Sequence, residues 1–309
     1  MAAATKISPR HWTQRYFGRL YGELYRKHLI PAKRSAAEAK FISQLLQLDH
    51  SLVLDLAAGF GRHARNLARK NRVFASDINA SYLREAVRGL PARSAKNLSV
   101  VCADMRQGPF RAASFDAVLL LFNSFGYFST ESHAGNDSHS RQVWKLPHVF
   151  YERGLVPEDH GVFKDAQPAR PAAGGSLSAA ADPNFEVLAE AARLLRPGGN
   201  FIIEIPNLKP LVQAIEEAPR RHISTSGYAI EEEFTYDYAT RTVSNRTRFR
   251  SGKAQESAEY HLRLYTKAEV VDAIRSFGFR IVKVMGDYTG ARYSAISSDM
   301  MLIHAKKSR

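Results

Sequence analysis

The sequence lacks the features that mark membrane-bound and secreted proteins. Its 309 residues include one cysteine, Cys102, which cannot form an internal disulfide. No stretch approaches the roughly 18 uninterrupted apolar residues that indicate a transmembrane helix. Lys6 and Arg10 near the N-terminus are not followed by the apolar run of a secretory signal. We therefore expect a protein of the reducing cytoplasm that does not associate with a membrane.

A concentrated basic tract is also missing, although the formal net charge is +14. The excess of lysine and arginine is spread along the chain, and acids outnumber bases over residues 131–182. Nucleic-acid-binding proteins usually gather positive charge on one face or in one run. A dispersed charge instead favours solubility, or attraction of an anionic small molecule. We therefore do not expect a nucleic-acid partner.

No residue set for nucleophilic or hydrolytic catalysis, such as a Ser-His-Asp triad or a pair of carboxylates, stands out in the sequence. The compositionally unusual stretch 131–182 contains four histidines, but their spacing fits no metal-ligand pattern and no cysteine joins them. They are His133, His139, His148 and His160. We therefore expect no metal site.

The sequence does contain a strand, a tight turn and a helix at residues 53–70. An apolar run ends at Leu56, a turn with Gly59 and Gly61 follows, and a helix is predicted over 62–70. A second apolar run ends at Asp77, 16 residues after Gly61. Glycines let the backbone approach a ligand closely, and an acid at the tip of the next strand is placed to bind ribose hydroxyls. The unit predicts the nucleoside-binding half of a doubly wound sheet.

The residues of the turn indicate which nucleoside it binds. Dinucleotide-binding folds need a third glycine beside the pyrophosphate, and this chain has Ala64 at that position. Asp55 would repel a phosphate at the helix N-terminus, and it suits a ligand with a positive group. The pattern resembles the Asp/Glu-x-Gly-x-Gly-x-Gly motif of class I S-adenosylmethionine (SAM) methyltransferases, with Ala57 in place of the first glycine.

Three further segments follow in the order that this resemblance implies. The run 98–105 is short and β-rich and ends at Asp104 and Met105. Residues 114–123 form a near-continuous apolar strand, typical of a strand that is buried on both faces. An amphipathic helix over 187–196 is stopped by Pro197 and two glycines, before another strand at 201–205. The chain resembles a class I methyltransferase from about residue 50 to the C-terminus.

The resemblance implies roles for individual residues. Asp55 would bind the amino group of the methionine moiety and Asp77 the ribose, while Asp104 would bind the adenine amino group. Asn123 and Tyr127 would lie where the methyl group points, and they are the expected catalytic residues. The full set of expected cofactor-binding residues is Tyr16, Tyr21, Asp55, Ala57, Gly59, Gly61, Asp77, Ile78, Asp104, Met105 and Asn123.

The expected fold is a doubly wound, seven-stranded, mostly parallel α/β sheet with a reversed terminal hairpin. Residues 1–50 are predicted as an N-terminal helical cap. In similar enzymes such a segment supplies a tyrosine near the methyl group, here Tyr16, Tyr21 or Tyr25; the alternative is that these tyrosines belong to the core. Residues 51–309 would form the SAM-binding domain. Within it, 131–182 is predicted as an insertion or lid, and the period-two alternation of 222–265 predicts an antiparallel β meander after the fifth strand.

The chemistry of SAM explains why no catalytic triad is needed. The enzyme must align the acceptor with an already activated methyl group and exclude water, and a general base is needed only if the acceptor arrives protonated. Methyltransferases of nucleobase amines often carry two prolines after the asparagine of the fourth strand, and Ser124 and Phe125 stand there instead. We therefore expect a small-molecule acceptor that is methylated on nitrogen or oxygen.

Other functions stay open at this point. The net charge alone favours an RNA methyltransferase, and the SAM site would equally serve a SAM-using cyclase or lyase, or a SAM-binding module without catalysis. The predicted meander could also form the edge of a homodimer.

Overall fold

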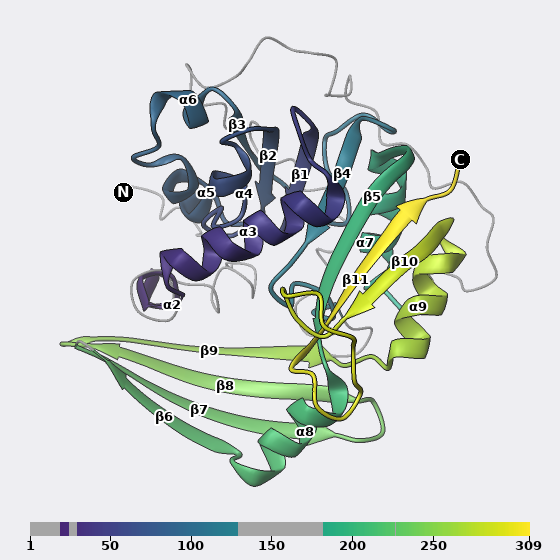
Figure 1. Ribbon diagram of the computed structural model, residues 1–309. Coiled ribbons are helices and arrows are strands. Elements are labelled where there is room, and N and C mark those ends of the chain that lie inside the picture. The colour runs from purple at the N-terminus through teal and green to yellow at the C-terminus, as the bar shows by residue number, and fades with distance from the viewer. Residues whose placement is uncertain (1–18, 25–29, 129–181, 226) are drawn as a thin grey trace, which may run out of the picture.

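The computed structural model describes residues 19–24, 30–128, 182–225 and 227–309, which contain two β-sheets (Figure 1). The larger sheet consists of β1 (Leu52–Leu56), β2 (Arg72–Asp77), β3 (Leu98–Cys102), β4 (Phe115–Leu120), β5 (Leu195–Pro206), β10 (Phe279–Met285) and β11 (Met300–Lys307). Its seven strands are ordered β10-β11-β5-β4-β1-β2-β3. Strands β1 to β5 are parallel to one another, and β11 runs antiparallel to both β5 and β10. The predicted mostly parallel sheet with a reversed terminal hairpin is confirmed.

Helices cover both faces of this sheet, because its strands point alternate apolar side chains to opposite sides. In β1, Val53 packs in a core shared with α3 (Ala32–Leu46) and α4 (Ala64–Leu67), whereas Leu54 belongs to a core shared with α7 (Phe185–Leu194) and α9 (Lys267–Ser276). Two further helices, α5 (Ala80–Val87) and α6 (Ala92–Ala95), connect β2 to β3. The result is a three-layer α/β arrangement.

The N-terminal helices lie close to the body of the protein. The helix α3 buries Ala39, Ile42 and Leu46 in the same core as Val53, so it forms part of the helical layer. The short α2 (Arg19–Leu24) lies next to the smaller sheet. The expected insertion over 131–182 lies outside the described residues, apart from Asp182, as do its four histidines.

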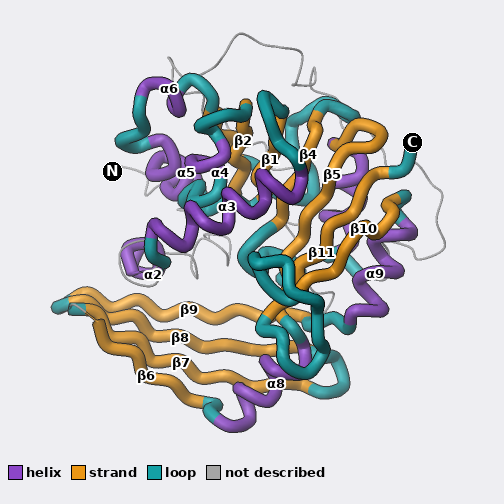
Figure 2. Tube along the Cα trace, viewed as in Figure 1, coloured by secondary structure: helices purple, strands orange, loops and turns teal. Residues whose placement is uncertain are grey.

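The smaller sheet is the predicted antiparallel meander. After β5 and α8 (Leu208–Glu217), the chain forms β6 (Arg220–Thr225), β7 (Tyr228–Asp237), β8 (Thr242–Ser251) and β9 (Ala254–Arg263), ordered as they follow in the sequence. Figure 2 shows these strands as a layer of their own, which extends from α8 to beneath α2. The outer face is charged, and the buried inner face carries apolar side chains together with the polar Asn245 and Thr247, so burial alternates as predicted.

Several predicted boundaries differ from the structure, and the helix predicted over 187–196 is α7, which ends at Leu194. The helix predicted over 62–70 is regular only in α4, because turns occupy the residues on both sides of it. The strand expected at 201–205 already begins at Leu195, which pairs with Phe115 across an irregularity in the register. Among the described residues, no helix is long and apolar enough to cross a membrane.

Candidate active site

Three acidic residues mark the carboxyl ends of neighbouring parallel strands. Asp55 lies in β1, Asp77 is the last residue of β2, and Asp104 follows β3 by two residues. The register pairs Asp77 with Cys102, so the ends of β2 and β3 are level. In open α/β sheets, ligands bind outside this edge. The structure therefore brings the three predicted acids to one edge of the sheet.

The turn after β1 has a left-handed backbone at three alternate positions, with φ of 56° at Ala57, 56° at Gly59 and 66° at Gly61. This conformation suits glycine and costs energy at Ala57, which explains why the resembled motif has a glycine there. A Cβ added at Gly59 would meet no atom within 4 Å, whereas one at Gly61 would lie 2.7 Å from the Cβ of Ala86. Gly59 thus borders open space, and Gly61 allows the turn to pack on α5.

Asp77 holds the turn in place. Its two carboxylate oxygens accept hydrogen bonds from the backbone N–H groups of Gly59 and Asn79, each at 2.8 Å. Burial raises the pKa of Asp77, and these N–H groups oppose that shift. The neighbouring Ile78 accepts a hydrogen bond through its backbone carbonyl from the Cys102 thiol at 3.5 Å. The ribose assignment therefore rests on a carboxylate that also orders the glycine turn.

Asp55 is a buried acid with few partners. Its exposed fraction is 2%, and it accepts a hydrogen bond from the Ala64 N–H at 3.2 Å. Burial raises the pKa of Asp55 to about 7, although the nearby charge of Arg62 and the Ala64 N–H lower it. A cationic ligand group would favour the ionised form of this carboxyl. Such a site fits the amino group of an amino acid.

Asp104 already has a partner, Arg106, which was not among the predicted residues. Arg106 donates to it through Nε and Nη2, with the shortest contact at 2.7 Å. The same guanidinium lies 4.1 Å from the centre of the Phe128 ring. Met105 packs against the core beside them. An adenine bound by Asp104 would share this carboxylate with Arg106.

The two expected catalytic residues follow β4. Asn123 has φ of 56°, and its side-chain oxygen Oδ1 is buried without a hydrogen-bond partner among the described residues. Tyr127 packs edge-on against Tyr260 of β9, with ring centres 5.7 Å apart. Between them, the carbonyl oxygen of Gly126 accepts a hydrogen bond from the backbone N–H of Arg263 at 2.8 Å. A Cβ added at Gly126 would lie 2.5 Å from the carbonyl oxygen of Arg263. The smaller sheet is thereby joined to the tip of β4.

A buried ionic cluster connects α3 to the turn after β1. Glu38 accepts hydrogen bonds from Arg34 at 2.7 Å, from His63 at 2.9 Å, and from Arg62. Burial alone would raise the pKa of Glu38, but the bonds from His63 and Arg34 and the charge of Arg62 lower it to about 2. Burial lowers the pKa of His63 to about 4, so this histidine is neutral at pH 7 and only a weak proton acceptor. Glu38 was not among the predicted residues, although its position one turn before Ile42 on the apolar face of α3 was a usable signal.

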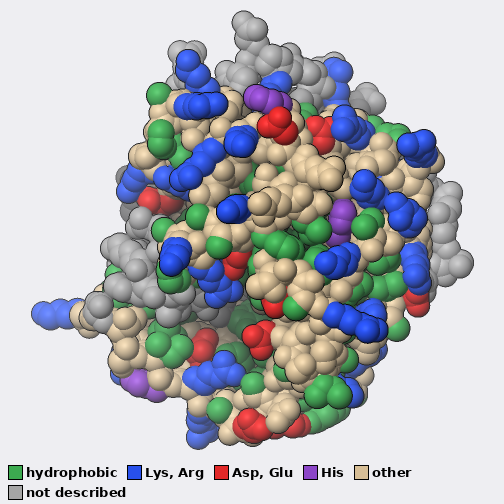
Figure 3. All heavy atoms as spheres, viewed as in Figure 1, with side chains coloured by type: hydrophobic (Ala, Val, Ile, Leu, Met, Phe, Trp, Pro, Cys, Tyr) green, Lys and Arg blue, Asp and Glu red, His purple; other side chains and the backbone are tan. Residues whose placement is uncertain are grey.

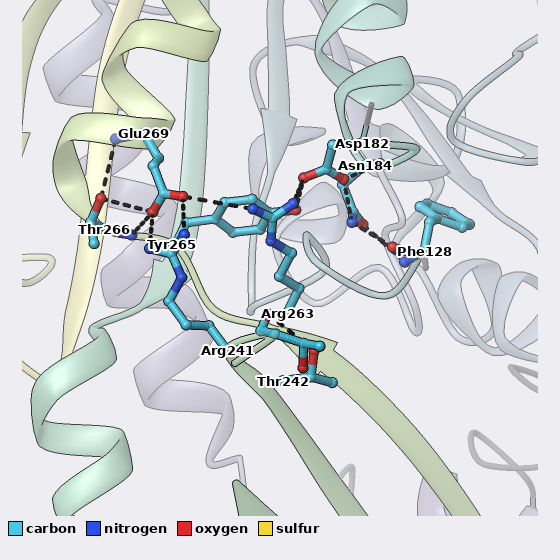
Figure 4. Close-up of polar contacts among 10 residues, drawn as sticks. Phe128, Asp182, Asn184, Arg241, Thr242, Arg263, Tyr265, Thr266 and Glu269 are labelled. Carbon is cyan, nitrogen blue, oxygen red and sulfur yellow. Dashed lines mark hydrogen bonds and ion pairs between the residues drawn. The ribbon is translucent and has the colours of Figure 1, made fainter. Parts of the chain in front are cut away.

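A second polar cluster fixes the segment that follows Tyr127 (Figure 4). Asn184 accepts the N–H of Phe128 at 2.9 Å and donates to its carbonyl at 2.6 Å. Asp182 accepts bonds from Asn184 and Tyr265 at 2.9 Å each, and also from Arg263. Chain positions 128 and 184 are therefore tied together on either side of the expected insertion.

The N-terminal tyrosines have different outcomes. Tyr16 and Tyr25 lie outside the described residues, so their predicted role stays a prediction. Tyr21 is buried in a cluster with Tyr82 and Phe249, and its ring meets that of Phe249 edge-on at 6.0 Å. It therefore packs between the body of the protein and β8.

The residues of this site fit SAM. The open space beside Gly59 admits a ligand next to the backbone, the buried Asp55 suits an ammonium group, and Asn123 offers an unpaired oxygen. Figure 3 shows that the face is hollowed between the α/β body and the smaller sheet, with hydrophobic side chains inside the hollow and both signs of charge around it. These features provide a ligand site with apolar walls and a few polar groups.

Comparisons with known proteins agree with this geometry. Residues 53–140 match the family described as a methyltransferase domain. The fold is similar to that of an S-adenosylmethionine-dependent methyltransferase from Clostridium acetobutylicum, with a TM-score of 0.65, 16% identity, and coverage of 94% of this chain and 98% of that one. The amino pentose methyltransferase CalS10 from Micromonospora echinaspora, solved with SAM bound, has a TM-score of 0.57 at 16% identity, with 94% and 98% coverage. The sugar N-methyltransferase KedS8 from a Streptoalloteichus species has a TM-score of 0.58 at 14% identity, with 100% and 99% coverage. No match is found among curated proteins. The predicted class I fold is confirmed, and residues 53–140 match a methyltransferase domain as the sequence predicts.

Proposed function

We propose that the chain is a SAM-dependent methyltransferase that methylates a nitrogen or oxygen atom of a small molecule, and that an amine nitrogen is the preferred acceptor. One observation supports the location of the cofactor site. Asp55, Asp77 and Asp104 stand at the ends of three neighbouring parallel strands, around the open space beside Gly59. This edge would hold the cofactor.

Each acid would contact a different part of SAM. Asp55 would bind the ammonium group of the methionine moiety, Asp77 the ribose hydroxyls, and Asp104 with Met105 the adenine. Gly59 would let the backbone approach the cofactor. The chemistry that bound SAM supplies is a methyl group on a positively charged sulfur.

The chain's own residues would complete the acceptor side. Asn123 and Tyr127 come from the tip of β4, and Tyr127 touches Tyr260 of the smaller sheet. This sheet would cover the acceptor and exclude water, while Asn123 orients it. Alignment of this kind accounts for a large part of the rate of a transfer reaction.

The amine preference is supported by the names of two proteins of similar fold, an amino pentose methyltransferase and a sugar N-methyltransferase. An RNA acceptor is less favoured, because the arginines on the outer face of the smaller sheet lie beside acids. Arg220 contacts Glu233 at 3.1 Å, and Arg246 contacts Glu259 at 3.7 Å. Such neutralised pairs form no basic stripe for phosphates.

The test is a transfer assay with SAM that carries a labelled methyl group. The acceptors are a panel of amines that includes aminosugars, the matched alcohols that lack the amine, and RNA. We expect label on an amine and release of S-adenosylhomocysteine. Label on RNA that falls steeply with rising salt would favour the RNA hypothesis, and release of methylthioadenosine would indicate a cyclase. SAM binding without any turnover would indicate a binding module. The cytoplasmic location and the homodimer stay predictions.

A further inference from the structure

The turn that carries Asn123 has a backbone that its residues do not favour. Phe122 and Asn123 have φ values of 57° and 56°, so two successive non-glycine residues are left-handed. This region is costly for a bulky side chain such as phenylalanine. Strained residues persist only where the surrounding structure holds them, and they often occur at functional sites.

Glu204 of the neighbouring strand β5 holds this turn. Its carboxylate oxygen Oε2 accepts the N–H of Phe122 at 2.9 Å, and the same oxygen accepts the hydroxyl of Tyr288 at 2.5 Å. Glu204 is 2% exposed, so these bonds are shielded from water. Tyr288 comes from the connection between β10 and β11, far from β4 in the sequence. A buried carboxylate with two donors fixes the backbone at the start of the turn.

The Phe122 side chain is held as well. The Arg62 guanidinium lies 4.7 Å from the centre of the Phe122 ring, and Arg62 is itself bonded to Glu38. The ring of Tyr288 stacks on that of His63, with ring centres 6.3 Å apart. The backbone and the side chain of Phe122 are thus both restrained by groups from other elements.

These restraints leave Asn123 with an unpaired acceptor. Its Oδ1 is buried without a hydrogen-bond partner among the residues that the structure describes. A buried carbonyl oxygen without a donor is unfavourable in a protein, and it calls for a ligand or a water molecule. The ligand chemistry that satisfies it is an N–H or O–H group.

We propose that Glu204, together with Tyr288, is a positioning residue that locks the Phe122–Asn123 turn, so that the amide oxygen of Asn123 receives the N–H of the amine acceptor. The proposal rests on the proposed function, because it assigns the acceptor to the tip of β4. It deepens that function by naming the group that orients the acceptor and the two residues that hold this group in place.

The test compares Glu204→Gln, which keeps a carbonyl acceptor for the Phe122 N–H, with Glu204→Met, which removes it. For Glu204→Met we expect kcat with an amine acceptor to fall at least tenfold and the exchange of the Phe122 amide hydrogen to accelerate at least tenfold. The Kd for SAM should stay within about twofold. Glu204→Gln should recover most of kcat, and Tyr288→Phe should give an intermediate loss.

Glu190 offers a matched control. It is a buried glutamate that accepts a backbone N–H, from Gly108, at 2.9 Å, and it pairs with Arg193 away from the β4 tip. Glu190→Gln should leave kcat and the Phe122 amide exchange unchanged, even if it lowers the melting temperature as much as the Glu204 variants do.

A double-variant measurement protects the test against loss of folding. Asn123→Gly removes the amide and relaxes the left-handed backbone, so Glu204→Met should cost less than twofold in kcat when it is added to Asn123→Gly, against at least tenfold in the wild type. Additive losses, or a normal kcat in folded Glu204→Met, would overturn the positioning role while the transfer reaction stands. Absence of amine methylation by the wild-type protein would instead overturn the proposed function, and the positioning role with it.

Discussion

SAM binding should strengthen as the pH rises from 5.5 to 7, because Asp55 must ionise to bind an ammonium group. Burial raises the pKa of this carboxyl to about 7 in the free protein. The positive group of the cofactor would lower that pKa in the complex. Below pH 7 the free protein therefore has to release a proton before the ammonium can bind well.

The size of the effect follows from the fraction of Asp55 that is ionised. With a pKa of about 7, roughly 3% is ionised at pH 5.5 and about half at pH 7, so the Kd should be about fifteenfold higher at pH 5.5, or ~1.6 kcal/mol. Binding at pH 6 should release about 0.9 proton. Higher pH is less informative, because an α-amino group itself loses its proton near a pH of about 8.

The assay is isothermal titration calorimetry of SAM in two buffers of different ionisation enthalpy. The difference between the two observed heats gives the number of protons released. Asp55→Asn is the control, since it cannot ionise and keeps an oxygen for the Ala64 N–H. It should bind SAM weakly, with little pH dependence over this range. A wild-type Kd that does not change between pH 5.5 and 7 would refute the reasoning.

The same carboxyl should affect the stability of the free protein. A carboxyl whose pKa is higher in the folded than in the unfolded protein opposes folding once it ionises. The penalty therefore begins above the unfolded pKa of about 4 and is complete above pH 7, where it reaches at most about 4 kcal/mol. Asp55→Asn should accordingly raise the melting temperature of the unliganded protein at pH 8 but not at pH 4.

Three further predictions concern the glycine turn and the expected insertion. In urea titrations, Gly61→Ala should lower the free energy of unfolding by about 2–3 kcal/mol, because the added Cβ would lie 2.7 Å from that of Ala86. Gly59→Ala is the control: its Cβ would meet no atom within 4 Å, so the free energy of unfolding should fall by only about 1 kcal/mol. Ala57→Gly should raise the stability by about 0.5–1 kcal/mol, because it relaxes a backbone with φ of 56°; a lower melting temperature would contradict this. Replacing residues 130–181 with a short Gly/Ser linker should preserve the fold, because hydrogen bonds join positions 128 and 184; loss of the circular dichroism spectrum or of cooperative unfolding would refute that.

Much of the sheet could be predicted because the pattern of apolar residues in each strand reflects which faces of that strand are buried. β4 is apolar almost throughout because helices cover both of its faces, and the strands of the meander alternate because only their inner face is buried. Asp55 and Asp77 could be placed at strand ends from the apolar runs before them. Local patterns of this kind report local structure.

The contacts between distant segments could not be predicted in this way. Glu38 meets His63 and Arg62 across more than 20 residues, and Glu204 meets Phe122 across 82. Nothing in the spacing of these residues indicates that they are partners, since the sheet order brings them together. The left-handed backbone at Phe122 is likewise invisible in the sequence, because it depends on the groups that surround the turn.

The central claim is tested most directly by calorimetry of SAM and S-adenosylhomocysteine on the wild-type protein, with Asp77→Ala beside it. The wild type should bind both ligands with a Kd in the micromolar range. Asp77→Ala should weaken SAM binding by about 1–3 kcal/mol, because it removes a charged hydrogen-bond acceptor and frees the Gly59 and Asn79 N–H groups. Absence of SAM binding in a folded wild-type sample, or an unchanged Kd in folded Asp77→Ala, would contradict a cofactor site at these strand ends.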